Sequence, residues 1–244
     1  AKCILCGDCV RMCEEIQGVG AIDFSNRGAR MKVMPAFDEP IANSACVGCG
    51  QCAAVCPTGA IVVKNDTQKM WGELSDPHTK CVVQIAPAVR VGISHEMGLG
   101  EGENAMGKVT AALRRLGFDK VFDTDFGADL TIMEEATELL GRIQSGGVLP
   151  MFTSCSPGWV KYLEHHFPEM IPNMSTCKSP MEMEGAIIKT YYAEKTGIDP
   201  ANIVVVAVMP CTSKKFEAQR PEMVVNGMRA VDVSLTTREL ARMI

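Results

Sequence analysis

Beyond residue 80 the chain alternates between short apolar runs and longer amphipathic stretches, and this alternation predicts an α/β domain. Short apolar runs are typical of strands buried on both faces of a parallel sheet. Strands that alternate with helices are joined by right-handed crossovers. The expected strands cover residues 81–91, 120–123, 148–153 and 203–209, and the expected helices cover residues 104–117, 128–145, 158–166 and 180–196.

The first part of the chain has a different pattern, in which cysteines recur at a fixed spacing. Two runs share the spacing Cys-x-x-Cys-x-x-Cys-x-x-x-Cys, one beginning at Cys3 and the other at Cys46. A polar stretch over residues 65–80 follows them and is the expected linker. We therefore expect one domain over residues 1–72 and the α/β domain over residues 73–244.

Thiolates at this spacing are typical ligands of cubane iron–sulfur clusters, in which the fourth cysteine of each run crosses to the other cluster. We therefore expect two [4Fe–4S] clusters in a ferredoxin-like α+β domain. The ligands of one would be Cys3, Cys6, Cys9 and Cys56, and those of the other Cys46, Cys49, Cys52 and Cys13. Disulfides and structural zinc are the alternatives, but zinc sites use paired Cys-x-x-Cys hooks rather than triplets with a trailing cysteine.

Composition and charge exclude several other functions. The chain has 244 residues and a formal net charge of −5, and nothing in it indicates nucleic-acid binding. No apolar stretch approaches the roughly 20 residues that span a bilayer, and no signal peptide is visible. Cluster thiolates need a reducing compartment, so we expect a cytoplasmic protein of an anaerobe. Because both ends lie inside incomplete features, near Cys3 and Ile244, we expect a fragment of a longer protein.

Three of the expected strands end in residues that suit a cofactor site. These ends are residues 86–88, 153–159 and 209–217, and the last two each carry a cysteine beside or close to a proline. In parallel sheets, ligands bind beyond the carboxyl ends of the strands. The three segments are therefore expected to surround a cofactor.

Two of these segments resemble signature motifs of the [FeFe]-hydrogenases. They read Thr-Ser-Cys-Ser-Pro-Gly-Trp at residues 153–159 and Met-Pro-Cys-Thr-Ser-Lys-Lys-Phe-Glu at residues 209–217. The resemblance extends through residues 126–139 and 175–180, and it includes the two-cluster module, so it covers essentially the whole chain. It implies that the α/β domain is the first half of a hydrogenase catalytic domain.

The resemblance implies a catalytic H-cluster, in which a [4Fe–4S] cubane is joined through one cysteine to a diiron unit with CO, cyanide and azadithiolate ligands. Cys211 matches one cubane ligand, and a third motif with two further cysteines would lie beyond Ile244. The first motif departs from the family pattern, because Ser156 stands where a cubane ligand is expected. The family commonly has two adjacent cysteines here, of which the first, matched by Cys155, donates protons and the second, at the position of Ser156, binds the cubane. Either Ser156 binds iron, or Cys155 does so in place of that proton-donor role, or the cluster is altered or missing.

The resemblance also implies roles around the diiron unit and along a proton path. Lys214 matches a lysine that donates a hydrogen bond to a cyanide ligand. The expected pocket residues are Pro87, Ala88, Met209 and Pro210, with Ala88 standing where many members have serine. The expected relay runs through Arg142, Glu138, Ser175, Glu135 and Cys155. From spacing alone, its three helical members could equally form a solvated stripe with an ordinary salt bridge.

Four further residues receive structural interpretations. Lys215 is expected to be a solvated surface lysine, and Glu217 to hold its loop by pairing with a basic side chain. Cys81 and Cys177 are expected to be core cysteines, since free cysteine is often buried.

The expected function is the reversible conversion of protons and electrons into hydrogen, with electrons relayed through the two cubanes. The expected partners are a ferredoxin or another electron-carrier subunit, and hydrogenase maturation proteins. The alternatives are a redox or hydrogen sensor on the same fold, an iron–sulfur assembly factor, and a fragment that only transfers electrons.

Overall fold

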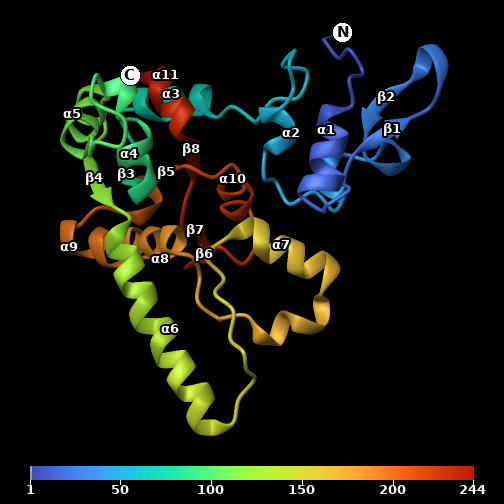
Figure 1. Ribbon diagram of the computed structural model, residues 1–244. Coiled ribbons are helices and arrows are strands. Elements are labelled where there is room, and N and C mark those ends of the chain that lie inside the picture. The colour runs from blue at the N-terminus through green and yellow to red at the C-terminus, as the bar shows by residue number, and fades with distance from the viewer. Residues whose placement is uncertain (1) are drawn as a thin grey trace. The chain divides into compact units, whose positions relative to one another are not determined.

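The structure, a computed structural model, describes residues 2–244 and divides into two compact units (Figure 1). The first contains the residues up to Lys64 together with Pro157–Ile171, and the second contains Asn65–Ser156 together with Pro172–Ile244. The expected boundary between residues 72 and 73 falls inside helix α3 (Thr67–Ser75). A segment from the middle of the expected α/β domain thus belongs to the first unit.

The first unit consists of short helices and one antiparallel hairpin. Each cysteine run enters a helix through a glycine with a left-handed backbone: Gly7 (φ 81°) precedes α1 (Asp8–Arg11), and Gly50 (φ 75°) precedes α2 (Gln51–Ala54). Glycine adopts this conformation without the steric cost of a Cβ atom. The other elements are η1 (Met12–Ile16), β1 (Asp23–Ser25), η2 (Gly28–Arg30), β2 (Lys32–Met34), η3 (Ala36–Asp38), η4 (Ile41–Asn43) and α7 (Pro157–His166), while η6 (Pro168–Asn173) runs from this unit into the second.

Four parallel strands form the sheet of the second unit, in the order β4-β3-β5-β8. They are β3 (Lys80–Ile85), β4 (Lys120–Asp123), β5 (Ile203–Met209) and β8 (Val233–Thr236). Val83 pairs with Val121 and Val206, and Val206 pairs in turn with Val233. The expected α/β domain with a parallel sheet is confirmed.

The core of the second unit surrounds β5, whose seven residues are all buried. Consecutive apolar residues suit a strand that is covered on both faces. Leu113 of α5, Met181 of α8 and Leu240 of α11 pack into the same core. The remaining elements of this unit are α4 (Pro87–Gly92), η5 (His95–Met97), α5 (Met106–Leu116), α6 (Asp125–Ser145), α8 (Pro180–Ile187), η7 (Ile188–Tyr192), α9 (Ala193–Thr196), η8 (Pro200–Asn202), α10 (Lys214–Glu217), β6 (Val224–Val225), β7 (Met228–Arg229) and α11 (Thr237–Met243).

Two of the expected strands are corrected by the structure. The first ends at Ile85 rather than at residue 91, because Pro87 occupies the first turn of α4, where its fixed φ and missing N–H are tolerated. Residues 148–153 form no strand of the sheet. Pro150 lacks the N–H that a ladder needs, and only Phe152 makes an isolated bridge, to Met174.

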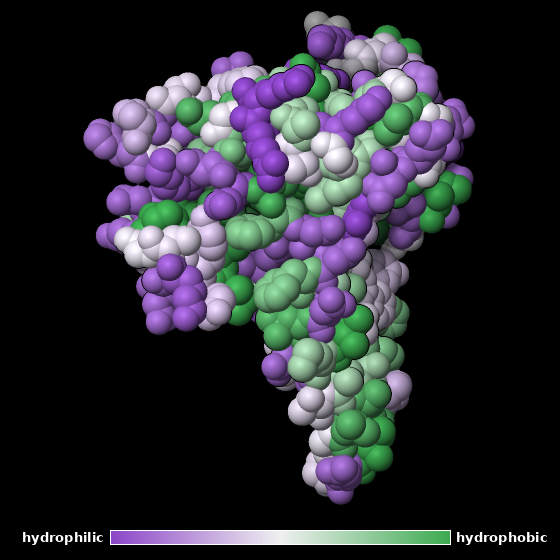
Figure 2. Space-filling view, turned by 90° about the vertical axis from the view of Figure 1, so that its left-hand side faces the viewer, coloured by the Kyte–Doolittle hydropathy of each residue, from purple (hydrophilic) through white to green (hydrophobic). Residues whose placement is uncertain are grey.

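Apolar side chains are exposed along the long helix α6, and they form much of the green surface at the lower end of Figure 2. They include Ile132, Met133, Leu140 and Ile143, each more than half exposed. The other side of α6 packs on α8. No helix within residues 2–244 is long and apolar enough to cross a membrane.

Candidate metal centres and candidate active site

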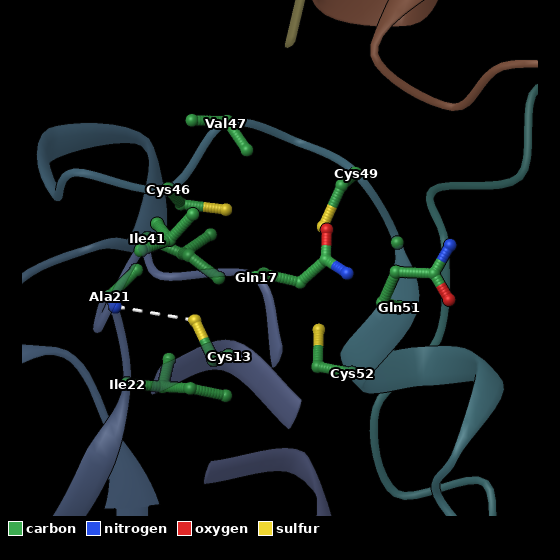
Figure 3. Close-up of a pocket in the computed structure, with 12 residues that line it drawn as sticks. Cys13, Gln17, Ala21, Ile22, Ile41, Cys46, Val47, Cys49, Gln51 and Cys52 are labelled. Atoms are coloured by element: carbon green, nitrogen blue, oxygen red, sulfur yellow. Dashed lines mark hydrogen bonds between the residues drawn. The ribbon is translucent and has the colours of Figure 1, made fainter. Parts of the chain in front are cut away.

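Four cysteines of the first unit surround one pocket, which we call the Cys13 pocket. They are Cys13, Cys46, Cys49 and Cys52. Figure 3 shows their sulfur atoms directed into a shared space, with the side chain of Gln17 among them. Cys13 comes from the first run and reaches this space from η1, whereas the other three follow each other along the second run.

The other four cysteines surround a second pocket, the Cys3 pocket. They are Cys3, Cys6, Cys9 and Cys56. Here Cys56 from the second run joins the first three cysteines of the first run. The trailing cysteine of each run therefore lies beside the other run, which is the arrangement that crossed ligation of two clusters needs.

The spread of the sulfur atoms fits clusters better than single ions. Within residues 2–244, no three side chains of His, Cys, Asp or Glu converge as the ligands of one metal ion would. A tetrahedral zinc site needs four such ligands around a single ion. A cubane is larger and takes its thiolates at separate corners, as four sulfurs spaced around a pocket allow.

Backbone N–H groups point at some of these sulfur atoms and favour their thiolate form. The N–H···S distances are 3.3 Å from Ala21 to Cys13, 3.4 Å from Gly48 to Cys46 and 3.2 Å from Ala60 to Cys56. Hydrogen bonds from the backbone of Ile61 and Thr58 lower the pKa of Cys56 to about 7, whereas burial raises the pKa of Cys52 to about 11. Because metal ligation requires the thiolate, binding must release protons.

Helix α7 packs behind residues that line the Cys13 pocket. Its Tyr162 packs against a small apolar cluster of Val19, Ala21 and Val47, which also contacts Cys13. Sequence reasoning missed this role, because α7 reads as an ordinary amphipathic helix. The segment that follows the first hydrogenase-like motif in sequence thus supports residues around a cysteine pocket without lining it.

In the second unit, Lys214 joins the two motif segments. Its ammonium donates a hydrogen bond to the carbonyl oxygen of Cys155 at 2.9 Å and pairs with Glu217 at 2.7 Å. The side chain of Glu217 is only 3% exposed, so this pair is largely shielded from water. Glu217 therefore pairs with a basic side chain, as expected.

The expected pocket residues lie at the ends of two neighbouring strands. Pro87 and Ala88 follow β3, and Pro210 follows Met209 at the end of β5, which pairs with β3. Met209 is buried, whereas the other three residues are exposed. Cys211 comes next and is half-buried. The chain thus brings these residues to the carboxyl edge of the sheet, where cofactors bind in such folds.

Three residues of the expected relay are connected by hydrogen bonds. Arg142 pairs with Glu138 at 2.5 Å, and the Ser175 hydroxyl donates to the other carboxylate oxygen of Glu138 at 3.1 Å. Partial burial alone would raise the pKa of Glu138. The Thr176 N–H, Arg142 and the two hydroxyls outweigh burial and lower this pKa. Glu138 is therefore held as a carboxylate with its partners in place.

The two remaining relay residues are not connected. One carboxylate oxygen of Glu135 is buried without a hydrogen-bond partner, and no bond joins it to Ser175 or Cys155 within residues 2–244. Cys177 lies nearby instead: its N–H donates to the Ser175 hydroxyl at 3.2 Å, and its pKa is raised by burial and by the charge of Glu135. Cys177 is half-buried rather than a core residue, unlike Cys81, which is 2% exposed.

The expectation that Lys215 is a solvated surface lysine is wrong. Its side chain is 9% exposed, and its ammonium bonds Asp66 at 2.6 Å, Glu239 at 3.0 Å and the carbonyl oxygen of Ser234 at 2.7 Å. Two carboxylates and a carbonyl satisfy a buried ammonium, which would otherwise be costly. Lys215 thus ties α10 to α11 and to the segment before α3.

The comparisons with known proteins agree with this geometry. The family described as "Iron only hydrogenase large subunit, C-terminal domain" matches residues 79–244, and the "4Fe-4S dicluster domain" matches residues 2–68. This chain belongs to the iron-only hydrogenase family. The expected two-cluster iron–sulfur module is confirmed, and the expected cofactors, two [4Fe–4S] clusters and the H-cluster, are those of a hydrogenase.

Individual relatives and a solved structure are similar to this chain at 46–50% identity. It is 50% identical to the NADP-reducing hydrogenase subunit HndD of Solidesulfovibrio fructosivorans over 249 residues, covering all of this chain and 43% of that protein. It is 46% identical to iron hydrogenase 1 of Clostridium pasteurianum, covering all of this chain and 42% of that protein. A solved structure of apo [FeFe]-hydrogenase HydA1 from Chlamydomonas reinhardtii matches with a TM-score of 0.70 at 46% identity, over 74% of this chain and 47% of that one. This chain thus spans less than half of the length of each of these relatives.

Proposed function

We propose that this chain forms the electron-transfer module and the first half of the catalytic domain of an enzyme that interconverts protons and hydrogen. The observation that carries the proposal is the placement of eight cysteines around two pockets, with the trailing cysteine of each run beside the other run. The two motif segments joined through Lys214 provide the second support. The H-cluster, when bound, supplies the metal site at which protons and electrons combine.

We propose the following ligand sets, which the pocket linings support. One [4Fe–4S] cluster is bound by Cys3, Cys6, Cys9 and Cys56, and the other by Cys13, Cys46, Cys49 and Cys52. Cys211 and either Cys155 or Ser156 bind the catalytic cubane. Thiolate suits iron–sulfur clusters better than the harder oxygen of serine, so we favour Cys155.

The second unit's own residues would orient the cofactor and deliver protons. Lys214, fixed by Glu217 and the Cys155 carbonyl oxygen, presents an ammonium to an anionic group. Pro87, Ala88, Met209 and Pro210 would line its pocket. Arg142, Glu138 and Ser175 supply a hydrogen-bonded path, and Glu135 would extend it once it comes within hydrogen-bond reach of Ser175. Cys155 would complete the path only in the arrangement in which Ser156, rather than Cys155, binds the cubane.

A redox or hydrogen sensor is the second candidate. Ser156 at a ligand position and the unpartnered Glu135 oxygen favour it, because both would change proton chemistry. A hydrogen-evolution assay on the full-length, matured protein separates the two candidates. Turnover well above the metal-free protein supports the enzyme, and turnover near background supports the sensor.

We further propose a cytoplasmic location, an electron-carrier partner such as a ferredoxin, and assembly by hydrogenase maturation proteins. The many unpaired cysteines support a reducing compartment. The proposed division at residues 1–72 and 73–244 can be checked by limited proteolysis. Because α3 (Thr67–Ser75) carries Met70 into the core of the second unit, a boundary ahead of this helix predicts cleavage before Thr67, whereas cleavage within residues 67–75 would support the division at residue 72.

A further inference from the structure

Two helices of the second unit begin with the same capping-box sequence, but only one of them forms the capping hydrogen bonds. In Thr236-x-x-Glu239, before α11, the box is formed: the Thr236 hydroxyl accepts from the Glu239 N–H, and the Glu239 carboxylate accepts from the Thr236 N–H at 2.7 Å. In Ser179-x-x-Glu182, before α8, neither bond is made. A capping box normally satisfies two free N–H groups at a helix start. The side chains at α8 are therefore directed elsewhere.

The open pair at α8 is deeply buried. Ser179 is 1% exposed and Glu182 is 0% exposed. The Ser179 hydroxyl and both carboxyl oxygens of Glu182 have no hydrogen-bond partner within residues 2–244. A buried carboxylate without partners is very costly, so a carboxyl in this position is expected to hold its proton.

The charged groups around Glu182 come from three neighbouring segments. Burial first, and then the charge of Glu217, raise the pKa of Glu182 to about 8, against the opposing charges of Lys214, Lys178 and Arg229. Glu217 and Lys214 form the ion pair that joins the two motif segments. Glu182 therefore adds a third titratable group to the Lys214–Glu217 pair.

The charges of Lys214, Glu217 and Glu182 together affect where the Lys214 ammonium points. Lys214 uses one N–H on the Cys155 carbonyl oxygen and one on Glu217, which leaves its third N–H available. With Glu182 neutral, the three side chains carry no net charge. An ionised Glu182 would add a second negative charge that attracts the ammonium and draws its third N–H away from the cofactor.

We propose that Glu182 is a positioning residue for Lys214: as a neutral acid it leaves the third N–H of the ammonium free for the cofactor. The proposal rests on the proposed function, because it gives Lys214 a cofactor to contact. It assigns a function to a buried carboxyl that the proton relay does not use.

The chain offers a matched control two residues further along. Glu184 is 2% exposed, and burial followed by the charge of Asp123 raises its pKa to about 8. Residues two apart on a helix do not share a face. Thr124 and Asp125 are among the groups that act on Glu184, and Lys214 is not. Glu184→Gln therefore removes a similar buried acid away from the proposed site.

Infrared difference titration of the metal-free, full-length protein gives the first test. Wild type should show bands of protonated carboxyl groups that disappear as pH rises through about 8. Glu182→Gln should lack one band and Glu184→Gln another. If Glu182→Gln loses no band at neutral pH, Glu182 is ionised there and the proposal is overturned.

The cyanide stretching bands of the matured protein give the second test. One pH unit above its pKa, only about one tenth of the Glu182 population would remain neutral. The wild-type bands should therefore shift near pH 9, those of Glu184→Gln should shift equally, and those of Glu182→Gln should stay in place. Equal shifts in all three proteins would overturn the proposal. A matured wild type without cyanide bands would contradict the proposed function instead, while the metal-free titration would still report on Glu182.

Discussion

The two units of this chain hold their functional residues in different ways. In the first unit the apolar clusters are small, as in the set Cys9, Val10 and Ile22, and the cysteines themselves are part of them. In the second unit a continuous core surrounds β5, and the site residues lie at its edge. We therefore expect the first unit to depend on bound metal for stability, and the core of the second unit to fold without metal.

Removal of iron should have the largest effect on the difference between the two units. When a chelator removes iron under anaerobic conditions, the backbone amides of the first unit should lose protection against hydrogen exchange, because the ligand thiols would lose their bonds to iron. Amides of β5 should stay protected, because their burial does not involve metal. Equal loss of protection in both units would show that the second unit also depends on iron.

Truncation of a core side chain should instead destabilise the second unit and leave the first unit unaffected. Leu113 is fully buried, so Leu113→Ala should lower the free energy of unfolding of the second unit by about 3 kcal/mol. Iron bound by the first unit should not change. Denaturant unfolding together with iron analysis checks this, and Leu140→Ala on the exposed side of α6 is the matched control, with an expected change below about 0.5 kcal/mol.

The proton relay tests the catalytic side of the second unit. Glu138→Gln keeps the size of the side chain but removes the charge that Arg142 and Ser175 contact. Hydrogen turnover should fall by about a hundredfold, a typical contribution of a positioned proton-transfer group. Cluster spectra should be unaffected. Glu134→Gln on the exposed side of the helix should retain wild-type turnover, and an equal loss in both variants would argue for a solvated stripe.

Buried acids give the second unit a stability that depends on pH. In the folded protein the pKa of Glu182 and of Glu184 is raised to about 8, whereas in the unfolded chain each has the ordinary pKa of about 4.3. The folded state thus binds more protons, and its stability falls as pH rises between these values. Each acid contributes a slope of about 1.4 kcal/mol per pH unit. We expect the free energy of unfolding, measured from pH 5 to pH 8, to fall less steeply with pH in Glu182→Gln and in Glu184→Gln than in wild type. Each variant should lack the slope that its missing acid contributes.

Much of the fold and site was predictable where it depends on local pattern. β4 and β5 have the expected bounds, because each is a compact apolar run. The cysteine spacing also led to the grouping that the pockets display. β8 was missed because Val233–Thr236 is short and carries Ser234 and Thr236, so it forms no continuous apolar run. The burial of Lys215 likewise depends on distant partners, Asp66 and Glu239, which no local pattern reveals.

The central claim is that eight cysteines in two crossed sets bind two iron–sulfur clusters. Iron analysis and EPR of the reduced full-length protein, compared with Cys49→Ala and the core control Cys81→Ala, test it most directly. Wild type and Cys81→Ala should show two interacting cubane signals, and Cys49→Ala should lose one of them with half of the iron of the first unit. Unchanged iron in Cys49→Ala, or zinc in place of iron in wild type, would contradict the claim.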